Sequence, residues 1–261
     1  MAQRVLKVGG HELDDPAFVA GLIEALKAMP ERPILVHGGG KEISQLSLDL
    51  GLSATFVSGM RVTDAATLRL AVMVMAGLAN KRLVAAMAAA ELPALGVSAV
   101  DLGLVRVTRW RHTGGDLGYV GRVVSVNADA FERLLALDAV IVLSPIATDD
   151  AGQLYNVNAD HVAQAVARSL GAGELVFVTN VPGVLRDGAL VPHLTAAEAE
   201  GLIRDGVVAG GMIAKVRAAL DAINDGVATV RIVNLASIAD GGTAITESDE
   251  VRGDGGDGVT E

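Results

Sequence analysis

The chain has 261 residues, of which 51% are hydrophobic and 3% aromatic, and its formal net charge at pH 7 is -10. This length allows a large core, whereas the excess of acidic residues argues against a nucleic-acid-binding protein. The complete absence of cysteine excludes a disulfide scaffold, a thiolate nucleophile and a Cys-type zinc site.

Short apolar runs and stretches of helical periodicity alternate along most of the chain. In chain order the pattern predicts a strand at Arg4–Val8, a helix at Pro16–Met29, a strand at Pro33–Val36, a helix at Lys41–Leu50, a long helix at Asp64–Glu91, a β-hairpin or small meander at Leu104–Val126, a strand at Ala139–Leu143, a helix at Ala159–Leu170, a strand at Leu175–Val178, helices at Ala196–Arg204 and Met212–Asn224, and a strand at Val230–Val233. Such alternation predicts an α/β fold with a mostly parallel sheet that is covered on both faces. Ligands of such folds bind at the carboxyl ends of the strands.

Three predicted strands end in loops that contain glycine. The loops are Lys7–Gly10, His37–Gly40 and Thr179–Gly183, and a further pair, Gly210-Gly211, opens the helix that carries Lys215. Glycine lets backbone N–H groups approach an anion, and a helix N-terminus adds a favourable dipole. Each loop alone could be a simple turn, but their recurrence favours anion binding. A P-loop is excluded, because Glu42 follows Gly40-Lys41 where Ser or Thr would be required.

Several polar residues stand at positions that a purely structural role explains poorly. Lys7 interrupts an apolar strand, and the cation of Lys215 opposes the dipole of its helix. Asn156, Asn158 and Asp160 alternate at a helix start, although capping needs only one of them. Arg61 precedes the long helix and carries the guanidinium that suits a carboxylate. The alternatives are an exposed strand end, a surface lysine, an ordinary cap and a solvated arginine.

Taken in order, the motifs over about residues 3–245 resemble those of the amino acid kinase family. They are Lys7-Val8-Gly9-Gly10, Val36–Gly40, Gly59–Asp64, Ala79-Asn80-Lys81, Asp116–Gly121, Asn156–Asp160, Thr179–Gly183 and Gly210–Val216. The resemblance implies a three-layer αβα sandwich with a mostly parallel central sheet. Within the family it favours the branch that transfers a phosphoryl group from ATP to the side-chain carboxylate of N-acetyl-L-glutamate, a step of arginine biosynthesis.

The resemblance also implies a role for each matching residue. Lys7 and Lys215 would stabilise the charge on the phosphoryl group in flight, and Asp160 would hold both lysines. The residues implied for substrate binding are Gly39, Gly40, Arg61, Asn156 and Asn158. Those implied for nucleotide binding are Gly9, Gly10, Gly38, Asn180, Val181, Gly183, Ala209, Gly210 and Gly211. ATP would bring Mg²⁺, held mainly by its phosphates, and no protein metal site is expected.

The chemistry of the acceptor agrees with this interpretation. A glutamate-type carboxylate has a pKa of about 4.3 and is already ionised at neutral pH, so no general base is needed. The five histidines do not cluster at metal-ligand spacing, and no Ser–His pair stands in a recognisable context. Three residues depart from the family pattern. Met60 replaces Leu, Ala214 replaces Pro, and Asn180 replaces Asp in the nucleotide loop, where it would change contacts with the ribose or the phosphates.

Two other functions remain open from the sequence. A related kinase phosphorylates a 2-aminoadipyl group on a small acidic carrier protein in lysine biosynthesis, and Arg106, Arg109 and Arg111 of the predicted hairpin could form a basic rim for such a carrier. A non-catalytic nucleotide or amino-acid sensor would need no phosphoryl clamp, so the presence of Lys7, Asp160 and Lys215 together argues against it.

The organisation and setting of the chain follow from the same patterns. We expect one domain over residues 1–245, with a substrate half at about 1–155 and a nucleotide half at about 156–245. Residues 246–261 form an acidic, Gly-rich tail that we expect to be disordered. Arginine-inhibited relatives carry an extra N-terminal helix, which predicts an arginine-insensitive homodimer here. The chain shows no signal-peptide pattern and no uninterrupted apolar run of roughly 20 residues, so we expect a cytoplasmic protein without a membrane or nucleic-acid partner.

Overall fold

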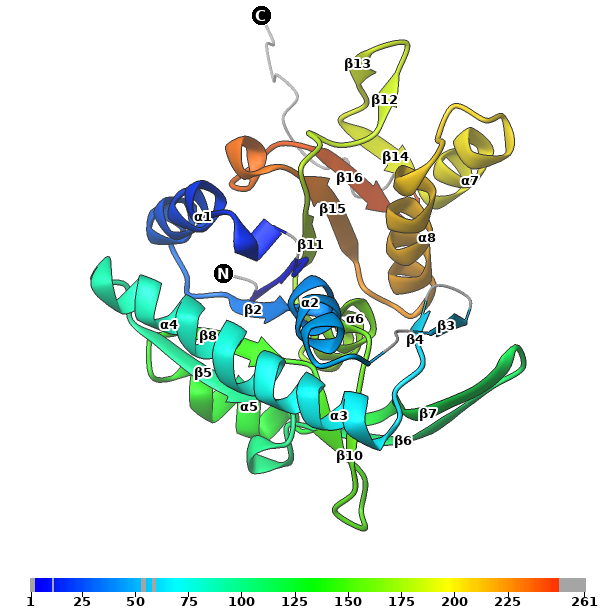
Figure 1. Ribbon diagram of the computed structural model, residues 1–261. Helices are drawn as coiled ribbons and strands as arrows, with labels where there is room; N and C mark the ends of the chain where they lie inside the picture. The colour runs from blue at the N-terminus through cyan, green and yellow to red at the C-terminus, as the bar shows by residue number, and fades with distance from the viewer. Residues whose placement is uncertain (1–2, 11, 53–54, 58–59, 249–261) are drawn as a thin grey trace, which may run out of the picture.

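The computed structural model describes residues 3–10, 12–52, 55–57 and 60–248, and confirms a three-layer α/β fold (Figure 1). Its central sheet has the strand order β14-β16-β15-β11-β1-β2-β8-β5. All neighbouring strands in it are parallel except β15 and β16. The strands are β1 (Arg4–Val8), β2 (Ile34–His37), β5 (Ala94–Ser98), β8 (Val140–Ser144), β11 (Glu174–Val178), β14 (His193–Thr195), β15 (Thr229–Val233) and β16 (Thr243–Thr246).

Helices cover both faces of this sheet, which explains why its inner strands are mostly apolar. One face packs on α1 (Pro16–Ala28) and α4 (Asn80–Ala89). The other packs on α5 (Ala128–Leu135), α6 (Ala159–Ser169), α7 (Ala196–Arg204) and α8 (Gly211–Asn224). Successive side chains of a strand point to opposite faces. In β1, Leu6 therefore joins the first core and Val5 the second, and Lys7 shares its face with Val5.

The predicted long helix extends from Ala65 to Ala89 in three segments. They are α3 (Ala65–Ala71), a π-helical segment η2 (Val72–Ala79) and α4. Asp64 caps α3 through its side chain. By length and composition alone this helix could cross a membrane, but 44% of its most apolar window is buried inside the fold. The sequence pattern does not reveal the π-helical turns, since a π-helical and an α-helical segment of the same apolar content look alike in the sequence.

A second, smaller sheet lies beside the central one. It closes four strands on one another, namely β6 (Val105–His112), β7 (Gly115–Val126), β9 (Ile146–Thr148) and β10 (Leu154–Asn156). The first two form the predicted hairpin, which projects from the body of the molecule (Figure 1). The remaining elements are α2 (Gly40–Asp49), the small ladders β3 (Phe56–Val57) with β4 (Met60–Arg61) and β12 (Leu185–Arg186) with β13 (Ala189–Leu190), and the short turns η1 (Glu12–Asp14), η3 (Asp101–Gly103) and η4 (Leu235–Ser237).

The sequence does not predict β5, α5, β14 or β16. Every residue of β5 is only half-buried at the edge of the sheet, so it lacks the apolar run of an inner strand. Strand β16 extends to Thr246, one residue into the predicted tail, because Thr246 pairs with Thr229 and Thr195 and is buried. Residues 249–261 lie outside the described residues, so the disorder of the tail stays a prediction.

Candidate active site

The carboxyl ends of β1, β2 and β11 meet at the centre of the sheet, because β1 pairs with both of the others. Two of the predicted glycine loops touch there. The backbone N–H of Gly38 donates to the carbonyl of Val8 at 3.1 Å. A methyl group added to Gly10 would lie 2.6 Å from the backbone nitrogen of Gly39. Glycine is therefore required at residue 10 by the close approach of two backbones.

Two cavities open on either side of this junction. The first, of about 700 Å³, is lined by predicted substrate residues, including Arg61, Asn156 and Asn158, and also by Gly38 and Gly39. The second, of about 350 Å³, is lined by Thr179, Gly211 and Lys215 from the predicted nucleotide half. The residues that line both cavities are Lys7, Gly9, Gly10, Gly40, Lys41 and Asp160. A group bound in one cavity can therefore meet a group bound in the other at Lys7 and Asp160.

Lys7 and Asp160 form an ion pair at this boundary. Lys7 Nζ lies 2.9 Å from Asp160 Oδ1, and the two side chains are 21% and 28% exposed. The pair follows from the fold, since Lys7 points to the face that α6 covers and Asp160 lies in the first turn of α6. In the part of the chain that the structure describes, Lys215 lines the same cavity but makes no ion pair with Asp160. The prediction that Asp160 holds both lysines thus has support for Lys7 alone.

Arg61 lies in β4 and reaches across to the start of α2. Its Nη2 donates to the carbonyl of Gly40 at 3.2 Å and to Ser44 Oγ, and its guanidinium lies 4.8 Å from the centre of the Phe56 ring. Its Nη1 is buried without a hydrogen-bond partner among the described residues. Burial lowers the pKa of Arg61, though a guanidinium still remains protonated at neutral pH. A cation with one buried, unused donor on a cavity wall is suited to an anionic ligand.

The two asparagines have different structural roles. Asn156 Nδ2 donates to Thr63 Oγ1 at 3.2 Å, which joins β10 to the segment that directly follows β4. Asn158 caps α6, and its Oδ1 accepts from the backbone N–H of Asp160 at 2.7 Å. Both residues line the larger cavity. The cap of Asn158 orients the turn that presents Asp160 to Lys7.

Some predicted nucleotide residues lie away from the cavity walls. Gly9, Gly10, Gly38 and Gly211 line one or both cavities. The five that are described but line neither are Asn180, Val181, Gly183, Ala209 and Gly210. Gly210 caps α8 with φ of 57°, a conformation that favours glycine. Its role here is to turn the chain into the helix that carries Lys215.

Sequence reasoning missed several residues that line the cavities, among them Glu12, Lys41, Ser44 and Met75. Lys41 and Ser44 directly follow the glycine run on α2, so their position after a strand-end loop was the available signal. Met75 carried no signal, because it belongs to an apolar helix and reaches the site only through the packing of the π-helical segment.

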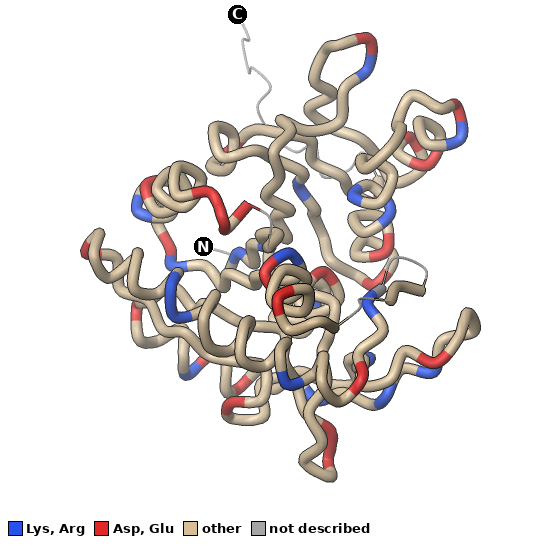
Figure 2. The backbone as a smooth tube through the Cα atoms, in the orientation of Figure 1, with Lys and Arg blue, Asp and Glu red and all other residues tan. Residues whose placement is uncertain are grey.

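The charge around the cavities differs in sign from that of the whole chain. Basic and acidic residues are interspersed over the fold (Figure 2), but Lys7, Lys41, Arg61 and Lys215 all line the two cavities. The first turns of α2, α6 and α8 also line the cavities, and helix N-termini favour anions. No group of three His, Cys, Asp or Glu residues suited to a metal ion occurs in the described ranges. The arrangement is suited to two anionic ligands brought together.

The fold and these paired cavities define a kinase of the amino acid kinase family, to which the chain belongs, since residues 3–234 match that family. Acetylglutamate kinase of Chloroflexus aurantiacus is 52% identical over 248 residues, which cover 94% of this chain and 97% of that protein. Acetylglutamate kinase of Geobacillus stearothermophilus is 46% identical, over 88% of this chain and 89% of that one. The solved structure of smu.665 from Streptococcus mutans UA159 is 28% identical with a TM-score of 0.76, and the match covers 94% of this chain and 98% of that one.

Proposed function

We propose that the chain transfers the terminal phosphoryl group of ATP to the side-chain carboxylate of N-acetyl-L-glutamate, forming an acyl phosphate in arginine biosynthesis. The observation that carries the proposal is the meeting of two cavities at Lys7 and Asp160, with Arg61 on the wall of one and Lys215 on the wall of the other. Relatives that are 46% and 52% identical over most of their length are named acetylglutamate kinase.

The larger cavity would hold the amino-acid substrate. The unused Nη1 of Arg61 would donate to its α-carboxylate, and Asn156 and Asn158 would orient the rest. The reacting side-chain carboxylate is ionised at neutral pH, so the site needs no general base. Phosphoryl transfer then depends on alignment and on neutralising the charge of the phosphoryl oxygens.

The residues at the boundary supply that neutralisation. Lys7 would contact the phosphoryl group from the substrate side, Lys215 would contact it from the nucleotide side, and Asp160 would hold the ammonium of Lys7 in place. Backbone N–H groups of Gly39 and Gly40 would donate to phosphoryl oxygens at the N-terminus of α2. The acyl phosphate leaves with the phosphoryl group bonded to the carboxylate oxygen, and ADP keeps the former bridging oxygen.

Magnesium is expected to enter with ATP. Two carboxylates line the nucleotide cavity, those of Glu12 and Asp160, and Asp160 already pairs with Lys7. This donor set fits an ion held mainly by the phosphates with Glu12 beside it, rather than a dedicated protein cage. When bound, Mg²⁺ neutralises charge on the phosphate oxygens.

The contacts of the hairpin arginines favour a small free substrate over one bound to a carrier protein. Arg109 pairs with Asp116 at 2.8 Å, and Arg106 donates to the carbonyl of Asp149 at 3.1 Å. Two of the three arginines that could form a basic rim are therefore engaged within the chain. Nor does a binding-only sensor account for Lys7 and Asp160 at the boundary of the two cavities, with Lys215 on the wall of the smaller one.

We further propose that the protein acts as a homodimer in the cytoplasm. A dimer contact through the long helix would cover the apolar side chains of Met73 and Leu78, which are 56% and 59% exposed. Size-exclusion chromatography with light scattering tests the assembly, and a hexamer would contradict it.

The test of the reaction is a coupled ADP-release assay with Mg²⁺ and hydroxylamine trapping. It compares N-acetyl-L-glutamate with L-glutamate, aspartate and 2-aminoadipate. Hydroxamate formed selectively from N-acetyl-L-glutamate supports the proposal. A folded protein that binds ATP but acts on no free amino acid would point to the carrier-bound substrate instead.

A further inference from the structure

Behind the glycine loop of β2 lies a buried polar network that the proposed reaction does not use directly. His37 and Asn80 have no exposed surface. His37 Nδ1 lies 3.0 Å from the carbonyl oxygen of Gly38, and His37 Nε2 lies 3.1 Å from Asn80 Nδ2. A carbonyl only accepts, so Nδ1 carries the proton and Nε2 accepts from Asn80. The imidazole is thus neutral, and burial lowers its pKa in agreement.

Asn80 is itself fixed on every side. Its Nδ2 also donates to the carbonyl of Val142 at 2.9 Å, and its Oδ1 accepts from Lys81 Nζ at 3.1 Å. The amide orientation follows from the second contact, because an ammonium group can only donate. Asn80 therefore determines which nitrogen of His37 is protonated, and that proton fixes the carbonyl of Gly38.

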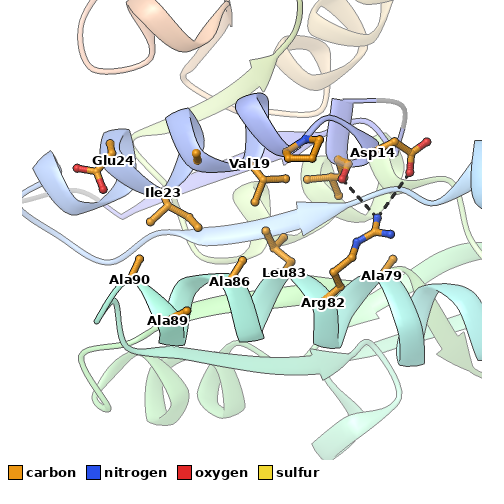
Figure 3. A pocket seen from close by; sticks show the side chains of 13 residues that line it. Asp14, Val19, Ile23, Glu24, Ala79, Arg82, Leu83, Ala86, Ala89 and Ala90 are labelled. Atoms are coloured by element: carbon orange, nitrogen blue, oxygen red, sulfur yellow. Dashed lines mark hydrogen bonds and ion pairs between the residues drawn. The ribbon is translucent and has the colours of Figure 1, made fainter.

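The same helical turn holds α2 from the solvent side. Arg82 Nη1 contacts Glu42 at 2.6 Å, and its Nη2 contacts Asp14 at 3.6 Å and the carbonyl of Leu13 at 3.3 Å. Figure 3 shows Arg82 reaching Asp14 at one end of the groove between α1 and α4. Glu42 lies in the first turn of α2, directly after the glycine loop. Arg82 thus ties the start of α2 to η1.

The π-helical segment accounts for this placement. A methyl group on Gly39 would lie 2.7 Å from Met75 Cγ, so η2 packs directly against the loop. The segment ends at Ala79, and Asn80 and Arg82 follow in the first turn of α4. Departures from α-helical geometry of this kind occur frequently at functional sites. The same long helix therefore contacts Gly39 through Met75, His37 through Asn80 and Glu42 through Arg82.

We propose that Asn80 and Arg82 are positioning residues that fix the backbone of Gly38–Gly40 for phosphoryl transfer, with Asn80 acting through His37. The inference rests on the proposed function, because it assigns the loop a role in binding the transferred group. Displacing the loop weakens contacts made in the transition state, so kcat and kcat/KM fall together while KM changes little.

The first test is N80D, which reverses the hydrogen bond to His37. At high pH the carboxylate must accept from Nε2–H, which leaves Nδ1 without a proton toward the carbonyl of Gly38. At low pH the imidazolium donates both to the new carboxylate and to the carbonyl of Gly38, which restores the hydrogen bond to Gly38. We expect kcat at pH 8 to fall at least about tenfold and the ratio to the parent kcat to recover below about pH 7. A pH-independent loss in a folded variant would overturn the role of Asn80.

Nitrogen-15 NMR of the His37 ring tests the same role without any activity. The unchanged protein should show a neutral ring protonated at Nδ1, whether or not N80D folds. A ring protonated at Nε2, or a cationic ring at pH 7, would overturn the proposal.

The second variant is R82M, whose side chain is 45% exposed and whose loss the fold should tolerate. Its matched control is R69M, since Arg69 is exposed on the same long helix and takes part in neither the Asn80–His37 contact nor the Arg82–Glu42 contact. We expect R82M to lower kcat about threefold to tenfold with both KM values unchanged. A kcat equal to that of R69M would refute the role of Arg82. Should the unchanged protein form no hydroxamate, the proposed function would fail, while the tautomer measurement would still stand.

Discussion

Removing the charge of Lys7 tests the centre of the site. Lys7→Met keeps the aliphatic stem within β1 and removes only the ammonium that pairs with Asp160 at 2.9 Å. Loss of one donor to charge that develops in a transition state costs about 2.7–4 kcal/mol, or about 10²- to 10³-fold in kcat. The ion pair is mostly buried, so its loss should cost more than the about 1 kcal/mol of a surface pair and less than the about 3–5 kcal/mol of a fully buried one. For a chain of this size, each kcal/mol corresponds to a fall in Tm of about 2–4 °C.

Hydroxamate formation under saturating substrates measures the effect. The matched control is Lys27→Met on α1, where Lys27 pairs with Glu24 at 3.2 Å on the surface. We expect Lys7→Met to be folded by circular dichroism and to lose at least about 100-fold in kcat, while the control keeps its activity. A kcat for Lys7→Met within threefold of the control would refute the assignment of Lys7.

Asp160→Asn extends the same test to the partner of Lys7. If Asp160 acts by holding Lys7, removing it from a chain that already lacks the ammonium should cost little more. The double variant Lys7→Met/Asp160→Asn should therefore resemble Lys7→Met alone. Fully additive losses would mean that Asp160 acts independently of Lys7.

Three further predictions follow from the contacts of the site. Arg61→Lys should raise the KM for N-acetyl-L-glutamate about 10- to 100-fold and change the KM for ATP less than threefold. One ammonium cannot replace a guanidinium that donates to α2 and to the substrate at the same time. Equal changes in both KM values would contradict this prediction. Gly10→Ala should lower the free energy of unfolding by about 1–3 kcal/mol and abolish turnover, since its methyl group would lie 2.6 Å from the backbone nitrogen of Gly39. The control is Gly77→Ala, whose methyl group would meet no atom within 4 Å. Equal Tm values for the two variants would refute the argument. Hydrogen bonds from the first turn of α3 lower the pKa of Asp64. The Asp64 carboxylate therefore contributes its full stabilisation above the unfolded pKa of about 3.9, and that stabilisation is lost as the pH falls through the lower folded pKa. Urea unfolding should show a lower free energy of unfolding for Asp64→Asn than for the parent near neutral pH, and this difference should shrink in acid.

The sequence by itself determines the layered fold and most of the chemical groups. Apolar runs such as Arg4–Val8 and Leu175–Val178 can be buried on both faces only in a covered parallel sheet, and the alternation with helices leaves few other architectures. The costly placement of Lys7 and the alternating Asn156, Asn158 and Asp160 also mark the site, because a polar group within an apolar pattern needs a partner.

The pairing of groups that are far apart in the chain is decided only by the tertiary structure. The sequence shows Lys7 and Asp160, but their 2.9 Å contact depends on β1 lying under the first turn of α6. Likewise, the roles of Gly38 and Asn80 depend on a π-helical segment that an apolar pattern cannot distinguish from an α-helix. Local patterns record what each residue requires, and only packing across the sheet decides which partner satisfies it.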